Sequence, residues 1–158
     1  MESKLAVLKS ELLRDMEKLE GLFDKFDTSY KKYKQQKEYA HLVESAFYVN
    51  QFYTGFERIF QNVADAFENT IDEKSWHKSL LERMALDIEN IRPPVISESN
   101  HRYLNELRSF RHFFRHLYDF DLEDEKFAIV AAKARELKKT YRADLEKFLG
   151  FINDLLKD

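Results

Sequence analysis

Turn-forming residues are scarce in this chain, and their scarcity restricts the possible folds more than any other feature. The 158 residues include three glycines and two prolines, while 44% are hydrophobic and 35% are charged. The prolines are adjacent, Pro93 and Pro94, so one extended segment is expected there. This composition leaves few places for turns between short strands and favours long amphipathic helices. We therefore predict an all-α protein with a single domain, residues 1–158.

Apolar residues recur at helical spacing in five segments. The predicted helices cover about residues 3–36, 38–69, 70–88, 97–117 and 123–155. Thr70 and Glu73 have capping-box spacing at the start of the third, and Ser97 or Ser99 can cap the fourth. The second has the strongest apolar stripe, so we expect it to be the central core helix.

Two residues of the second helix need an explanation from packing. Gly55 lowers helix propensity in the middle of the segment, and we expect another helix to come close to it. Glu57 lies within the aromatic stripe, where an unpaired carboxylate is costly. We expect it to pair with Arg58 of the same helix or with an arginine of the fourth helix, in a structural role.

Residues 101–118 form a basic segment in a chain of negative net charge. The chain has 26 Lys and Arg against 29 Asp and Glu, a formal net charge of −3, which argues against a general binder of polyanions. The basic residues of the segment, opposed by Glu106, are His101, Arg102, Arg108, Arg111, His112, Arg115 and His116. Any contact with nucleic acid is therefore expected to be confined to this segment.

The segment contains Arg111, four residues later His116, and then Tyr118. Arg111 is a fixed cation, and histidine is the side chain that ordinarily titrates near neutral pH. His116 could move a proton while Arg111 holds a phosphate, which is enough to cleave a phosphodiester without metal. On an ideal helix these two residues lie about 140° apart, so they converge if the last turn unwinds or if a second copy of the chain supplies one of them. RNA should then yield a cyclic 2′,3′-phosphate, and DNA, which lacks the 2′-hydroxyl, should stay intact.

The residues alone leave other interpretations of this segment open. Arginines and histidines are ordinary on the solvent-exposed face of an amphipathic helix. His112 and His116 are four residues apart and could hold a metal ion, although no third ligand is evident nearby. Arg108 and Arg115, about one turn to either side of Arg111, fit phosphate contacts and plain surface positions equally well.

Arg111, His116 and Tyr118 match the Arg-x4-His-x-Tyr motif, and through it the chain resembles the HEPN superfamily, specifically HepT-like ribonuclease toxins. The similarity covers roughly residues 40–155. Its further stretches follow in the same order and are Phe52-Tyr53-Thr54-Gly55-Phe56-Glu57-Arg58-Ile59-Phe60, Trp76-His77-x-x-Leu80-Leu81-x-x-Met84, Arg92-Pro93-Pro94 and Leu107-Arg108-Ser109-Phe110-Arg111-His112-Phe113-Phe114-Arg115-His116.

The resemblance implies a five-helix antiparallel bundle that homodimerises, with both motifs lining a shared cleft where tRNA or mRNA is cut without metal or another cofactor. Arg111 would stabilise the phosphate, His116 would be the acid or base, and His112 would help to orient them. It also implies a minimal nucleotidyltransferase antitoxin that can attach AMP to Tyr118 and so fill the cleft with a bulky anion. The alternative is a non-catalytic helical module that binds nucleotide or RNA beside a nucleotidyltransferase.

The cysteine count and the apolar runs lead to an expectation about location. The chain has no cysteine, so neither a disulfide framework nor a thiolate site is available, and a reducing cytoplasm is the simplest location. Its start lacks the pattern of a signal peptide, and no run of apolar residues is long enough to cross a bilayer. We therefore expect a cytoplasmic protein without a membrane span.

Overall fold

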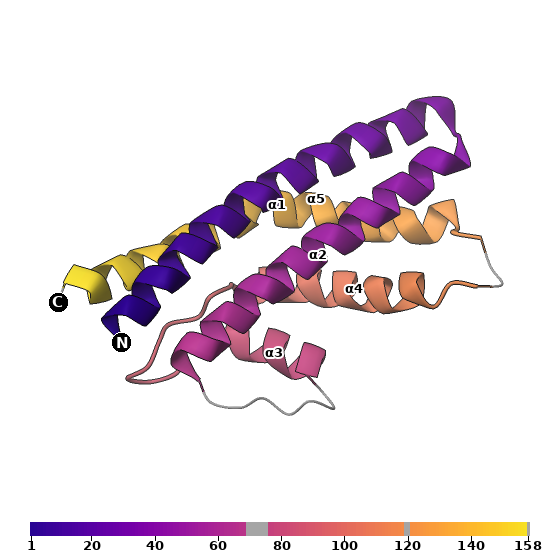
Figure 1. Ribbon diagram of the computed structural model, residues 1–158. Coiled ribbons are helices and arrows are strands. Elements are labelled where there is room, and N and C mark those ends of the chain that lie inside the picture. Colours follow the sequence, from indigo (N-terminus) through magenta and orange to yellow (C-terminus); the bar gives the residue numbers. More distant parts are fainter. Residues whose placement is uncertain (69–75, 119–120, 158) are drawn as a thin grey trace.

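The structure is a computed structural model that describes residues 1–68, 76–118 and 121–157. In these residues the chain forms five α-helices, which are α1 Glu2–Gln36, α2 Tyr39–Phe67, α3 Trp76–Met84, α4 Glu98–Arg115 and α5 Asp124–Lys157. Figure 1 shows α1 and α2 as a long antiparallel hairpin, with α4 and α5 as a second antiparallel pair beside it and the short α3 near the end of α2. The predicted all-α bundle is confirmed. None of the helices in the described ranges is both long enough and apolar enough to cross a bilayer.

The core joins α1, α2 and α5 through stacked aromatic rings. The ring of Phe23 in α1 stacks on Phe52 of α2, with centroids 4.2 Å apart, and on Tyr141 of α5, at 4.9 Å. The apolar stripe of α2 is at most 2% exposed, and it consists of Val49, Phe52, Phe56, Ile59, Phe60 and Val63. As predicted, α2 is a central helix, because its apolar side chains are buried along most of its length.

Gly55 lies where α1 comes close to α2. A Cβ atom at this position would stand 3.0 Å from Cδ2 of Leu19 in α1, closer than ordinary packing allows. The expected close approach of another helix is thereby confirmed, and the neighbouring helix is α1.

The third helix is shorter than its apolar spacing predicts. It ends at Met84, whereas the spacing extended it through Leu86 and Ile88. Ile88 instead forms an isolated antiparallel bridge with Arg92, with N–H to carbonyl bonds of 2.9 and 3.0 Å. Asn90, between them, turns the chain with a φ of 65°. The predicted capping box at Thr70 and Glu73 falls outside the described residues.

A buried arginine explains why the chain can leave the helix at this point. The side chain of Arg92 is 0% exposed and forms an ion pair of 2.8 Å with Glu68. It also donates to the carbonyl oxygens of Arg83, Leu86 and Pro93 at 3.0–3.2 Å. The carbonyl oxygen of Arg83 also accepts a bond from the N–H of Leu86 at 3.1 Å, so Arg92 adds to the turn that ends α3 and satisfies the carbonyls of Leu86 and Pro93 after it. The interaction thus fixes the connection from α3 to α4.

The start of α4 is anchored on α5. The Ser97 hydroxyl accepts a bond from the N–H of Asn100 at 3.3 Å, which identifies Ser97 as the cap. Asn100 is fully buried, donates to Asp144 at 2.6 Å and accepts from the Thr140 hydroxyl at 2.6 Å. Because both partners belong to α5, this network sets the position of α4 and, with it, of the basic segment.

Candidate functional site

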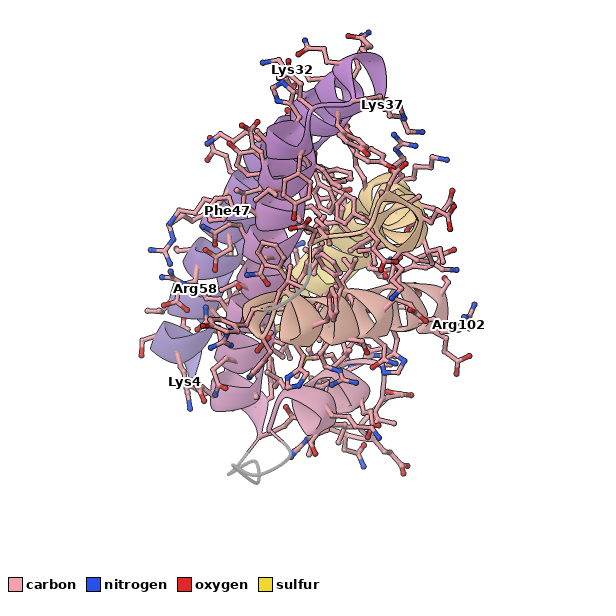
Figure 2. All side chains as sticks on the ribbon, turned by 90° about the vertical axis from the view of Figure 1, so that its right-hand side faces the viewer. Lys4, Lys32, Lys37, Phe47, Arg58 and Arg102 are labelled. Carbon is pink, nitrogen blue, oxygen red and sulfur yellow. The ribbon has the colours of Figure 1, made fainter. Side chains whose placement is uncertain are left out.

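The residues predicted to form the site line one concavity on α4, with the exception of Tyr118. The concavity has a volume of about 110 Å³, and its lining residues are Arg108, Arg111, His112, Arg115 and His116. Tyr118 is 92% exposed and does not line it. Arg102 of the same basic segment lies near the start of α4 and projects away from the bundle (Figure 2). The second half of α4 therefore gathers the basic groups.

The end of α4 explains how Arg111 and His116 reach the same concavity. The helix ends at Arg115, and His116 follows with φ −106° and ψ 11°, outside the helical region. Its N–H bonds to the carbonyl oxygen of Phe113 at 3.1 Å, a tighter turn than an α-helix makes. The separation of an ideal helix no longer applies to His116. The chain thus leaves the α-helix at His116, and Arg111 and His116 line the same concavity within one chain.

His116 is fixed in one tautomer by the main chain. Its Nδ1 atom lies 2.8 Å from the carbonyl oxygen of His112. A carbonyl oxygen can only accept, so Nδ1 carries the proton of this hydrogen bond. In the neutral ring, Nε2 is then the basic nitrogen that can take a proton from a hydroxyl. The ring of His112 stands beside it, with centroids 4.4 Å apart.

Arg111 is held from behind by α2. Its Nη1 forms an ion pair with Oε1 of the buried Glu57. The expectation that Glu57 pairs with an arginine of the fourth helix is confirmed, and the partner is the arginine of the motif. Arg58, the other candidate, projects from the outer side of α2 (Figure 2), where it lies 3.9 Å from Asp15 of α1.

Tyr53 is a further residue of this site that sequence reasoning did not identify. The guanidinium carbon of Arg111 lies 5.8 Å from the centroid of the Tyr53 ring, within the range of a cation–π interaction. The hydroxyl is buried and makes no hydrogen bond within the described parts of the chain. Burial and the charge of Glu57 raise the pKa of Tyr53, whereas Arg108 and Arg111 lower it. The spacing of Tyr53 and Glu57, four residues apart on one helix, was the signal available in the sequence.

The other two arginines add positive charge at the rim. Arg108 donates twice to the side-chain oxygen of Asn105, through Nε at 3.1 Å and Nη2 at 3.0 Å. Arg115 is exposed at the end of α4. With Arg111 they form a cationic surface suited to a phosphate group.

The histidine pair does not gain further metal ligands from the rest of the described chain. No group of three or more His, Asp or Glu side chains that could hold a metal ion occurs in residues 1–68, 76–118 and 121–157. His112 and His116 thus lack a third ligand in this region.

The helical bundle and the basic concavity at the end of α4 together define a HEPN-type protein. The chain belongs to the HepT-like protein family, whose match covers residues 44–152 and so includes all the lining residues. No curated protein and no solved structure matches the chain significantly. Membership of this family suggests a HEPN-type toxin of the nuclease kind.

Proposed function

We propose that this protein is a metal-independent endoribonuclease toxin that cleaves cellular RNA, tRNA or mRNA, in the cytoplasm. The observation that carries the proposal is that Arg111 and His116 line one concavity, with Nε2 of His116 as its basic nitrogen. A phosphate-binding cation and a neutral imidazole beside it are what cleavage of a phosphodiester by its own 2′-hydroxyl requires.

In the proposed reaction, Nε2 of His116 accepts the proton of a ribose 2′-hydroxyl. The 2′-oxygen forms a bond to the adjacent phosphorus, and the bond from phosphorus to the 5′-oxygen breaks. The departing 5′-oxygen takes up a proton, so the products are a 2′,3′-cyclic phosphate and a 5′-hydroxyl. Arg111 donates hydrogen bonds to the phosphoryl oxygens, on which negative charge increases in the transition state. Arg108, His112 and Arg115 support the bound phosphate.

We also propose that the active form is a homodimer with the two concavities facing each other. A concavity of about 110 Å³ is suited to a phosphate group and leaves the neighbouring nucleotides in need of another surface. A second copy related by a two-fold axis supplies a matching one. His116 of the partner subunit could then protonate the 5′-oxygen.

Tyr118 is the proposed point of control by a minimal nucleotidyltransferase antitoxin. Its side chain is 92% exposed, so an enzyme that attaches AMP can reach its hydroxyl. The adduct would carry a phosphate two residues from His116, where it would compete with RNA for the arginines.

The test is to incubate unmodified protein with total RNA in EDTA, beside the variants His116→Ala and Arg111→Ala. Cyclic phosphate ends that form with the unaltered protein and disappear in both variants are expected. Equal cleavage by all three proteins would exclude this site. Salt-dependent binding without cleavage would favour the non-catalytic module, provided that the intact mass shows no AMP on Tyr118.

A further inference from the structure

Two side chains of α2 reach the site from behind α4, and one of them bonds the arginine that the proposed reaction uses. We infer that Glu57 is a positioning residue, which fixes the guanidinium of Arg111 so that its second terminal nitrogen, Nη2, faces the bound phosphate. Tyr53, one turn earlier on α2, supports the same guanidinium through its ring. The inference rests on the proposed function, because it assigns Glu57 a part in that reaction.

The geometry allows Arg111 to be anchored and available at the same time. Nη1 is paired with Glu57, yet the Arg111 side chain is 19% exposed and lines the concavity. The Nε atom is buried and makes no hydrogen bond within the described residues, so the N–H groups of the other terminal nitrogen, Nη2, are the ones left for a phosphate oxygen. No exchange of partners is needed when phosphate arrives. The carboxylate at one end and the Tyr53 ring beside the guanidinium restrict a side chain that is otherwise flexible.

The negative charge of Glu57 weakens the attraction of Arg111 for phosphate, and the fixed orientation of the guanidinium can offset this loss. Glu57 places a negative charge next to a cation proposed to attract phosphate, which weakens that attraction. A fixed guanidinium, however, needs no reorientation when charge develops on the phosphate in the transition state. Glu57 is therefore expected to favour turnover over affinity, and its removal should separate kcat from RNA binding.

Substitutions at position 57 distinguish orientation from charge. The amide oxygen of Glu57→Gln can accept the same bond from Arg111, so kcat should stay within about threefold of the wild-type value, with RNA bound as tightly or more tightly. Glu57→Ala removes the acceptor, and kcat should fall by about 10²-fold, the typical effect of a misplaced group, while the Kd for RNA changes by less than about threefold. Glu57→Asp is one methylene too short to reach Nη1 and should behave like the alanine variant.

The matched control is Asp15→Asn. Asp15 is also a buried acid of the bundle, but it belongs to α1, where it pairs with Arg14 at 3.6 Å and with Arg58 of α2 at 3.9 Å. Its substitution should alter stability without changing kcat. A merely structural role for Glu57 predicts the same behaviour as Asp15→Asn.

The experiment measures single-turnover cleavage of a defined RNA in EDTA, RNA binding in the His116→Ala background, and the fold by circular dichroism. Loss of cleavage in Glu57→Ala with recovery in Glu57→Gln supports the inference. Cleavage by Glu57→Ala at the wild-type rate overturns it, as does an equal loss in the alanine and glutamine variants. If Glu57→Ala does not fold, the contrast between the glutamine and aspartate variants decides in the same way.

An inactive wild-type protein would refute the proposed function and not the anchoring itself. The NMR signal of the Arg111 Nε–H group then tests whether Glu57 anchors the guanidinium, because this signal reports restricted motion and does not require cleavage activity. A distinct signal in wild type and Glu57→Gln that is lost in Glu57→Ala supports anchoring. The same signal in all three proteins overturns it.

Discussion

The Nδ1 atom of His116 donates a hydrogen bond to the main-chain carbonyl oxygen of His112, 2.8 Å away. Because the acceptor belongs to the main chain, the bond does not depend on the side chain at position 112. His112→Ala should therefore keep the tautomer of His116 and reduce cleavage by about tenfold or less. His116→Ala should lose at least about 10²-fold, the usual share of a general acid or base. Rates at saturating RNA test this, and an equal loss in both variants would place the His112 imidazole in the reaction.

Tyr53 should make the stability of the protein sensitive to alkaline pH. Its pKa is raised above the ordinary value of 10.0 by burial first and by Glu57 second. The folded protein therefore keeps this proton at a pH where the unfolded chain loses it, so stability that is complete below pH 10 is lost as pH rises.

Tyr53→Phe should remove this loss, which amounts to up to about 1.4 kcal/mol for each pH unit above 10. At pH 8 the variant should be at least as stable as wild type, because the hydroxyl makes no hydrogen bond within the described residues. Urea unfolding at pH 8 and pH 11 measures both effects. An identical decline in the two proteins would show that Tyr53 ionises normally and that other tyrosines with raised pKa values, Tyr30, Tyr33 and Tyr141, account for the decline.

Alanine substitutions at the glycines should have opposite effects on stability. A Cβ at Gly55 would meet Leu19 at 3.0 Å, whereas positions 21 and 150 have nothing within 4 Å. Gly55→Ala gains about 1 kcal/mol of helix propensity but overpacks the core at a cost of about 1–3 kcal/mol. We expect a net loss there and a gain of up to about 1 kcal/mol for Gly150→Ala. Thermal unfolding compares them, and stabilisation by both would mean that Leu19 can move aside.

The buried arginine of the connection between α3 and α4 should matter more than any surface ion pair. Arg92→Ala leaves the side chain of Glu68, which is 3% exposed, with Arg83 at 3.4 Å as its remaining cation. It also removes the donor to three carbonyl oxygens and should lower the free energy of unfolding by about 3 kcal/mol. Arg142 pairs with Glu146 at 3.0 Å, but its side chain is 53% exposed, and its substitution should cost much less because solvent screens exposed ion pairs. Urea unfolding of both variants measures the two losses in free energy of unfolding. Losses of similar size would contradict the prediction.

The sequence predicted the helices and the lining of the site, but two helix ends had to come from the structure. The apolar spacing of α4 continues through Leu117, although the helix ends at Arg115. The spacing of α3 likewise continues through Ile88, although Arg92 donates to carbonyls where the chain leaves the helix at Met84. Apolar periodicity records which side chains face the core, and it persists where the backbone stops being helical.

The partners of Glu57 and Tyr53 illustrate a second limit of the sequence. A buried carboxylate requires a cation, so an arginine of the fourth helix was predictable for Glu57. Which arginine it contacts depends on the register between α2 and α4. The same register places the Tyr53 ring beside Arg111, a contact between residues 58 positions apart that no local pattern records.

The proposed chemistry depends on where a helix stops. His116 is the first residue beyond α4, and one further helical turn would carry its imidazole around the helix axis, away from Arg111, with both side chains intact. A binding partner that extends the helix, or a substitution that favours its continuation, would therefore inactivate the protein without touching a reacting atom. The position of the His116 imidazole relative to Arg111 thus depends on the backbone dihedral angles at the end of α4.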